Sequence, residues 1–215
     1  VSAVQEDVVE RSANAAVSGR IEESDGIILP QIVLPYELAS MTSGGSLDIP
    51  NHQTKVLGVG SYKYGVIKME NNGKLVIDGD VKMHLTDDPS FLTGNNNELI
   101  VKEGASLKIY LDGRVSFENN IVINNLSQKP SSFIIYSMYT GPGGVIIAHQ
   151  DDFKGVIYAL ETDVVITNNA NVSGAVVGKT ITISNNSQVH YDQALGEYSD
   201  EKTLSSLHNW REARK

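Results

Sequence analysis

The hydrophobic residues of this chain come in short runs that alternate with polar side chains, and turn-forming residues separate the runs. In residues 180–184, TITIS, the isoleucines fall on one face and the hydroxyls on the other, as in a half-buried β-strand. Asparagine pairs follow two such runs, at 168–169 and 185–186, which are 185 − 168 = 17 residues apart. Because asparagine tolerates the left-handed backbone conformation, each pair can bend the chain sharply. Strands and bends repeated at nearly constant length predict a β-solenoid.

The strand-and-turn pattern begins at Val56, so we expect one β-solenoid domain over residues 56–198. The alternation in this domain places His84 on the solvent side of its strand. Two polar segments, Thr86–Glu98 and Asn124–Ser132, are expected to be loops that protrude from the coil. Short, evenly spaced strands are also compatible with a sandwich or barrel. The recurrence of Asn-Asn and Asp-Gly at matching offsets favours the solenoid.

Two flanking segments differ from this pattern. Residues 1–55 combine a high apolar content with three prolines, Pro30, Pro35 and Pro50, which predicts a lead-in and an extended segment that wraps across the domain and covers one side. Residues 199–215 change to helical spacing, with one apolar face made by Leu204, Leu207 and Trp210. We expect a C-terminal helix that caps the open end of the coil. The expected fold is therefore a single-domain, all-β solenoid with an extended N-terminal wrap and a C-terminal capping helix.

Charge and composition narrow the range of functions. The formal net charge is 17 − 26 = −9, without a basic block before the last few residues, which argues against electrostatic binding of nucleic acid or anionic lipid. The chain has no cysteine, so disulfides, cysteine-ligated zinc and thiol catalysis are excluded. No apolar run approaches the ~20 residues of a membrane helix. Because the sequence starts at Val1 rather than at methionine, we expect a fragment from which a membrane helix has been removed.

Several motifs carry a resemblance to a known family. The most specific are GVIYA at residues 155–159, GAVVGK at 174–179 and HYDQAL at 190–195, within a match from Gly58 to Glu212. These stretches resemble the extracellular C-terminal β-solenoid domain of bacterial type IV pilus-associated, minor-pilin-type proteins. The resemblance implies a pilus or cell-surface location, pilus or cell-surface proteins as partners, no established catalytic residues and no cofactor. A more distant resemblance, to tapirin-type surface adhesins, implies polysaccharide binding as an alternative function.

One cluster has the composition of an enzyme site. His149, Asp151 and Asp152 place two carboxylates beside a histidine, and such groups can perform acid–base chemistry on a glycoside. A β-helical polysaccharide hydrolase or lyase is therefore a second alternative function. The competing interpretation is a solvated turn, because carboxylates adjacent in sequence point apart on a strand.

Three further carboxylates are candidate calcium ligands. Asp78, Asp80 and Asp112 lie in Asp-Gly turns, and Ca²⁺ binds several carboxylate oxygens at bends. Neither turn continues into the ligand series of a known calcium loop, and Asp-Gly is also an ordinary turn dipeptide.

Tyrosines are the candidate contact residues. Tyr62, Tyr64, Tyr110 and Tyr139 are expected to form a surface for a ligand or partner, because a tyrosine ring can stack on a sugar or anchor a protein. The alternative is that about half of the tyrosines simply pack in the core or in loops.

Overall fold

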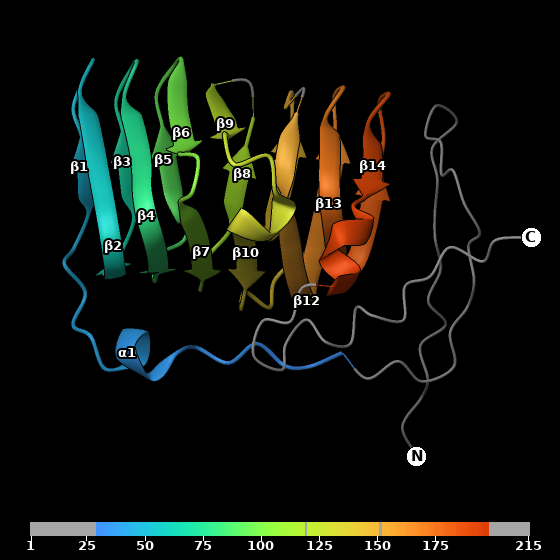
Figure 1. Ribbon diagram of the computed structural model, residues 1–215, viewed down its shortest axis with the longest axis horizontal. Helices are drawn as coiled ribbons and strands as arrows, with labels where there is room; N and C mark the ends of the chain where they lie inside the picture. The colour runs from blue at the N-terminus through green and yellow to red at the C-terminus, as the bar shows by residue number, and fades with distance from the viewer. Residues whose placement is uncertain (1–28, 119, 151, 198–215) are drawn as a thin grey trace, which may run out of the picture.

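The computed structural model describes residues 29–118, 120–150 and 152–197. This part of the chain is dominated by short strands, and every strand pair in it is parallel (Figure 1). In chain order the elements are α1 (Tyr36–Ala39), β1 (Leu47–Ile49), β2 (Thr54–Tyr64), β3 (Ile67–Met69), β4 (Lys74–Leu85), β5 (Phe91–Thr93), β6 (Asn97–Val101), β7 (Ser106–Leu111), β8 (Val115–Phe117), β9 (Ile121–Asn125), η1 (Pro130–Ser132), β10 (Phe133–Ser137), β11 (Val145–Ala148), β12 (Phe153–Thr167), β13 (Asn171–Ile183), β14 (Gln188–Tyr191) and η2 (Gln193–Glu197).

The strands form a β-solenoid of about seven turns, which confirms the predicted fold class. Parallel neighbours exclude the sandwich of hairpin-linked antiparallel strands, because parallel strands need a crossover between them. In the first two turns a short strand, β1 or β3, is followed by a longer strand, β2 or β4, and in the next two turns the longer strand is divided into β6 and β7 and into β9 and β10 (Figure 1). The longer strand β4 bends at a corner where Gly79 has a φ of 136°, and a Cβ there would lie 2.6 Å from Val59 Cγ2. Residues 78–80, expected to be a turn, are therefore a corner inside β4 that requires glycine.

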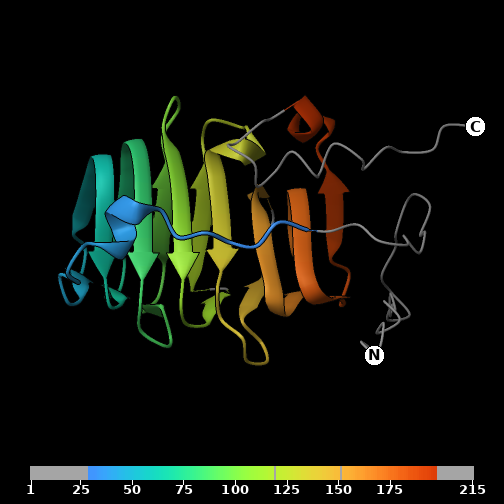
Figure 2. The same cartoon turned by 90° about the horizontal axis from the view of Figure 1, so that it is seen from below.

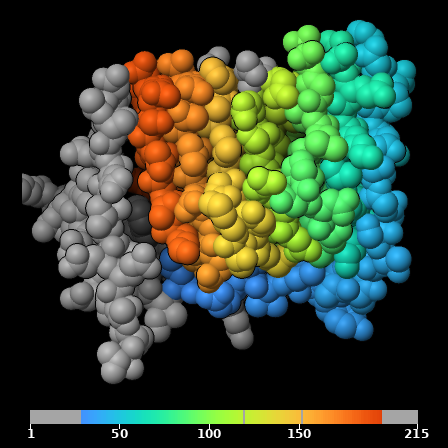
Figure 3. Space-filling model, turned by 180° about the vertical axis from the view of Figure 1, so that it is seen from behind, coloured from blue at the N-terminus to red at the C-terminus, as the bar shows by residue number. Residues whose placement is uncertain are grey.

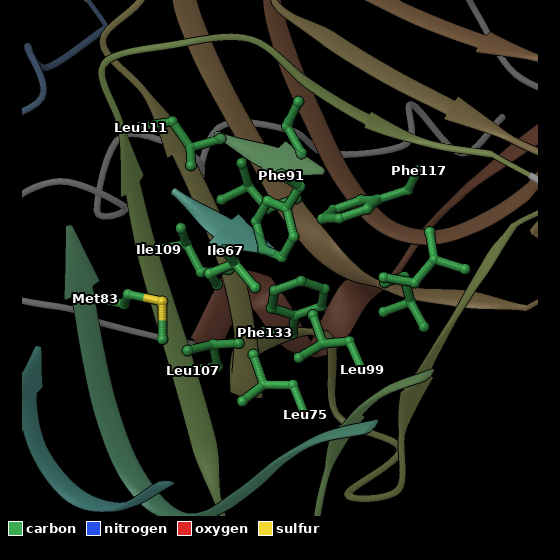
Figure 4. Packing of buried hydrophobic residues seen from close by; sticks show 14 of the residues in the cluster. Ile67, Leu75, Met83, Phe91, Leu99, Leu107, Ile109, Leu111, Phe117 and Phe133 are labelled. Atoms are coloured by element: carbon green, nitrogen blue, oxygen red, sulfur yellow. The ribbon is translucent and has the colours of Figure 1, made fainter. Parts of the chain in front are cut away.

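Aliphatic side chains stack in register inside the coil. Leu75 pairs with Leu99 and Leu99 with Ile123, while Met83 pairs with Ile109. These side chains are buried, and those of Leu75, Met83, Leu99 and Ile109 point toward the axis of the coil (Figure 4). Burying one such side chain contributes about 1.5–3 kcal/mol relative to leaving it exposed. The continuous column is thus the main stabilising feature of the fold.

Asparagines stack at one turn of successive coils. Asn168 and Asn185 have φ values of 55° and 51°, in the left-handed region predicted for them. Asn185 Nδ2 donates to Asn168 Oδ1 at 3.0 Å, and the backbone N–H of Asn169 donates to the carbonyl of Asn185 at 2.9 Å. Earlier coils use the same geometry at Asn72 and Asn96. Each pair therefore both bends the chain and bonds to the next coil.

An extended segment, residues 29–46, crosses the outside of one face and is called the N-terminal strap. It runs along the long axis of the solenoid beneath β13, β12, β10 and β7 to α1 (Figures 1 and 2). Leu38 of α1 is fully buried against this face, and the Tyr158 hydroxyl donates to the carbonyl of Pro30 at 2.6 Å. The predicted wrap is confirmed for these residues. The first coil, however, begins at Leu47 rather than at Val56.

Both predicted loops contain regular structure. Residues 86–98 include β5 and the start of β6, and Phe91 of β5 packs inside the coil against Phe117 at a centroid distance of 5.2 Å. Residues 124–132 start with the end of β9 and include η1. The predicted capping helix, residues 199–215, lies outside the described residues. Among the described helices, none has the length and hydropathy needed to cross a membrane.

Candidate functional site

The described residues of the enzyme-like cluster, His149 and Asp152, lie in the connection between β11 and β12. His149 takes the place of an asparagine in the turn stack, with a φ of 55°, and its backbone N–H donates to the carbonyl of Asn168 at 3.2 Å. Asp152 is exposed and forms an ion pair with Lys154, while Asp151 lies outside the described residues. The described geometry therefore matches the turn interpretation of this cluster.

The residue in this stretch with a clear structural role is Gln150, which sequence reasoning missed. Its side chain is 3% exposed and lies against β9. Gln150 Nε2 donates to the carbonyl of Ile121 at 2.6 Å and to that of Glu118 at 3.1 Å, and its Oε1 accepts from the N–H of Ile123 at 3.1 Å. β9 pairs with β6 of the previous coil, and the Gln150 amide bonds backbone groups of β9 that this pairing leaves open. A glutamine in a polar turn gives no sequence signal for this role.

The calcium candidates do not converge in the described structure. The three carboxylates have different partners: Asp78 contacts Lys102 Nζ at 2.8 Å, Asp80 accepts from Ser106 Oγ at 2.7 Å, and Asp112 contacts His84 Nε2 at 2.9 Å. Within residues 29–118, 120–150 and 152–197, no group of three metal-ligating side chains is present.

His84 does not face solvent, so this prediction is wrong. The side chain lies on the outer face of β4, as the alternation predicts, but only 4% of the residue is exposed because the N-terminal strap, which includes α1, covers that face. Its Nε2 pairs with Asp112, whereas its Nδ1 is buried without a partner.

The four candidate tyrosines fall in three places. Tyr110 is 6% exposed beneath the strap and stacks on Tyr136 with ring centroids 4.9 Å apart. The prediction that Tyr110 belongs to a contact surface is therefore wrong. Tyr139 is half-buried in the connection between β10 and β11. Tyr62 and Tyr64 come together at the first coil, with ring centroids 6.4 Å apart and an interplanar angle of 12°.

The strand register explains why Tyr62 and Tyr64 lie at the end of the solenoid formed by the first coil. Tyr62 pairs with Met83 and Tyr64 with Leu85, so both occupy inward positions of the hydrophobic column. On the other arm of β2, Lys55 pairs with Leu75. Leu57, paired with Ile77, stays aliphatic, whereas at these three inward positions the first coil replaces aliphatic side chains by side chains that have an apolar stem or ring and a polar tip. Such residues can cover the last layer of a column while their tips reach water.

Each ring lies over a glycine. The Tyr62 hydroxyl donates to the carbonyl of Gly58 at 3.0 Å, and the ring lies beside Gly60. The Tyr64 ring lies over Gly44 of the strap, where a Cβ would be 3.4 Å from Tyr64 Cδ1. Burial raises the pKa of the Tyr64 phenol, and the neighbouring Tyr62 adds a smaller contribution in the same direction.

We call this surface the first-coil end; it consists of Lys55, Val56, Val59, Tyr62, Lys63 and Tyr64. Lys55 and the two tyrosines occupy inward positions of β2, whereas Lys63, paired with His84, lies on the outer side of the strand. Val56 and Val59 are 52% and 77% exposed at the outer edge of β2. The sequence indicated the two tyrosines but gave no reason to group them with residues 55–59. Only the corner at Gly60 and the register with β4 bring the two arms of the strand to one end of the column.

The fold and this site define a parallel β-solenoid that closes its own first end and carries a strap along one side. The chain belongs to the family described as a domain of unknown function (DUF7305), whose sequence model matches residues 7–198. Neither the curated proteins nor the solved structures gave a match.

Proposed function

We propose that this chain is a non-enzymatic, extracellular structural and adhesive domain of a type IV pilus-associated surface protein. The observation that supports the structural part is the uninterrupted column of buried side chains from the first coil to the last. A close-packed interior transmits strain rather than yielding to it. A coil stacked in this way is a stiff body that holds its surface at a fixed distance from its point of attachment.

The contacts between coils support the same role. Ion pairs and amide bonds join neighbouring coils on the outside, as between Lys74 and Glu98 at 2.8 Å and between Asn168 and Asn185 at 3.0 Å. The strap adds an apolar cluster on a second side of the sheet, with Tyr136 and Tyr158 nearly inaccessible beneath it. Successive coils form continuous bands over the molecular surface (Figure 3). A body braced inside and outside suits a protein that bears load at a cell surface.

The location is the part of the proposal that depends on resemblance. The motifs at residues 155–159 and 174–179 lie in β12 and β13, where they build the solenoid. They support a shared fold with the pilus-associated proteins, and the surface location is inferred from it.

Protease treatment of intact cells tests the location. Cells that produce the full-length protein are treated with a non-permeant protease, and the domain is followed with an antibody, with a cytoplasmic protein as control. The proposal expects loss of the domain from intact cells and its recovery with pili sheared from untreated cells. Protection of the domain until the cells are lysed would refute the surface location, and its absence from sheared pili would refute the pilus association.

A further inference from the structure

We propose that the first-coil end binds an anionic polysaccharide, with the two tyrosine rings stacking on sugar rings and the two lysines pairing with its carboxylates. This inference extends the proposed adhesive role by naming the surface and the class of ligand.

Within the described part of the chain, the lysines at this end have no carboxylate beside them, unlike several basic side chains on other coils. Five of those form ion pairs: Lys74 with Glu98, Lys82 with Glu37, Lys102 with Asp78, Arg114 with Asp88 and Lys154 with Asp152. β2 has Lys55 and Lys63 and no acidic residue. Neither lysine forms an ion pair with another described residue. The first coil also has one exposed carboxylate, Asp48 of β1, so its two strands together carry a net charge of 2 − 1 = +1 in a chain of net charge −9. Its β2 edge is therefore a locally cationic surface that complements an acidic ligand.

The tyrosine pair supplies the apolar part of the site. The rings are nearly parallel, at 12°, and half-buried, so they are fixed in position while part of their surface stays accessible. A fixed ring stacks on a ligand at a low entropic cost. Carboxylates on the same ligand form charge-assisted hydrogen bonds with lysine ammonium groups. A polymer of acidic sugars offers both features along its length.

An acidic peptide added as an extra strand fits this end less well. At the Tyr64 end of β2 the backbone edge is already occupied, because Gly44 N–H donates to the carbonyl of Lys63 at 2.9 Å and Gly65 N–H donates to that of Gly45 at 2.6 Å, so an added strand could pair only with the part of the edge before Lys63. A second copy of the chain also fits poorly. Antiparallel pairing of two β2 edges centred on Val59 places Lys55 of each copy opposite Lys63 of the other, and directly opposed like charges are destabilising.

The path of the chain leaves this end accessible. The strap begins where Pro30 bonds to Tyr158 of β12, and Leu195 of η2 is buried in the same apolar cluster. Both ends of the described chain therefore lie beside β12 to β14, whereas the first-coil end is at the opposite end of the long axis (Figure 1). The described chain thus enters and leaves the coil at the end opposite the lysines and tyrosines.

Solution binding of the full chain to polygalacturonate tests the proposal, with neutral dextran and poly-L-glutamate as comparison polymers. The double variant Lys55→Gln/Lys63→Gln removes the charges, and Lys129→Gln/Lys179→Gln is its matched control, because both control lysines are exposed and lie on other coils. The variant Tyr62→Met/Tyr64→Leu introduces the types found at the paired positions Met83 and Leu85, so it removes the rings while keeping the column filled. Circular dichroism checks that each variant is folded.

We expect polygalacturonate to bind the unmodified chain, weakly or not at all at 1 M salt because salt screens the ion pairs. Lys55→Gln/Lys63→Gln and Tyr62→Met/Tyr64→Leu should each weaken binding at least tenfold, with the control pair unchanged.

Absence of binding, or an equal loss in both lysine pairs, would overturn the proposal. Equally strong binding of poly-L-glutamate that is insensitive to Tyr62→Met/Tyr64→Leu would assign the surface to acidic peptides instead. Dimerisation in sedimentation experiments that Val59→Lys abolishes would assign it to a second copy. The assay is independent of where the protein is located, so its outcome and that of the protease experiment can be told apart.

Discussion

Replacing Tyr158 by phenylalanine isolates the bond that anchors the start of the N-terminal strap. The Tyr158 side chain is fully buried and its hydroxyl donates to the carbonyl of Pro30 at 2.6 Å. Tyr158→Phe keeps the ring in the apolar cluster and removes only this bond. The loss of one hydrogen bond costs about 0.5–1.5 kcal/mol. The unpaired carbonyl of Pro30 adds a desolvation cost where water cannot reach that carbonyl. Because Pro30 is half-buried, we expect a total loss of about 1–2 kcal/mol at neutral pH.

The same substitution should remove part of the pH dependence of stability. Burial raises the pKa of Tyr158 to about 12, from the value of 10.0 expected in the unfolded chain. Between these values the folded protein keeps the phenol proton while the unfolded chain releases it, so the contribution is complete below pH 10 and is lost as the pH rises to about 12. Two pH units correspond to at most about 3 kcal/mol, and we expect about 1–2 kcal/mol after screening by solvent.

Denaturant unfolding at pH 7, 10 and 11.5 measures both effects. Tyr36→Phe is the control, because Tyr36 is on the same strap and is 84% exposed. We expect the unmodified chain and Tyr36→Phe to lose stability together between pH 10 and 11.5, and Tyr158→Phe to lose less. A change below about 0.5 kcal/mol at pH 7, the usual surface value, would refute the anchoring role. An unchanged pH slope in Tyr158→Phe would refute the assigned shift in pKa.

Four further predictions concern the coil, and each is checked by the free energy of unfolding of the variant. Leu99→Ala should cost about 2–5 kcal/mol because Leu99 is fully buried, whereas Ile183→Ala should cost about 1–2 kcal/mol because Ile183 is only partly buried; equal costs would contradict the assigned burial. Gly174→Ala should destabilise more strongly than either, since a Cβ there would lie 2.0 Å from the carbonyl oxygen of Gly155 and φ is 147°, so native-like stability would be inconsistent with this backbone geometry. Gln150→Ala should cost about 2–4 kcal/mol because it leaves buried backbone groups of β9 unpaired, and a cost near zero would mean that water replaces the amide. Asn168→Ala should cost about 1–2 kcal/mol through the strained φ and the lost amide bond, with Asn168→Gly recovering part of it; a glycine variant no better than alanine would argue against the backbone contribution.

The sequence was sufficient to predict features that repeat in every coil. Alternation of apolar and polar residues indicates a strand regardless of its partner, and an asparagine pair indicates a left-handed bend. Both signals are local, so the solenoid and the conformation of Asn168 and Asn185 could be predicted. Alternation did not reveal that Phe91, in the predicted loop of residues 86–98, lies in a strand. β5 has three residues, too few for alternation to be visible, and its polar flanks are typical of a loop.

Features that depend on contacts between distant segments could not be predicted. Alternation correctly assigns His84 and Tyr110 to the outer face of their strands, but it does not say what covers that face. The strap lies there, and its position relative to the sheet is set by residues that precede the coil. The first-coil end has the same origin: Tyr62 and Tyr64 were visible as tyrosines, but their grouping with Lys55 depends on the corner in β2.

Disulfide trapping across neighbouring coils tests most directly that the coils stack in parallel and in register. The natural chain has no cysteine, so an introduced pair has no competitor. Lys74 and Glu98 are paired positions on β4 and β6, and adjacent strands place such residues within the 4.4–6.8 Å Cα separation of a disulfide. Stacking in register predicts complete oxidation of Lys74→Cys/Glu98→Cys with the fold retained, and no bond in Lys74→Cys/Ile100→Cys, where the second cysteine is two residues out of register. Efficient oxidation of the shifted pair, together with failure of the paired one, would contradict the stacking on which the fold and both proposals rest.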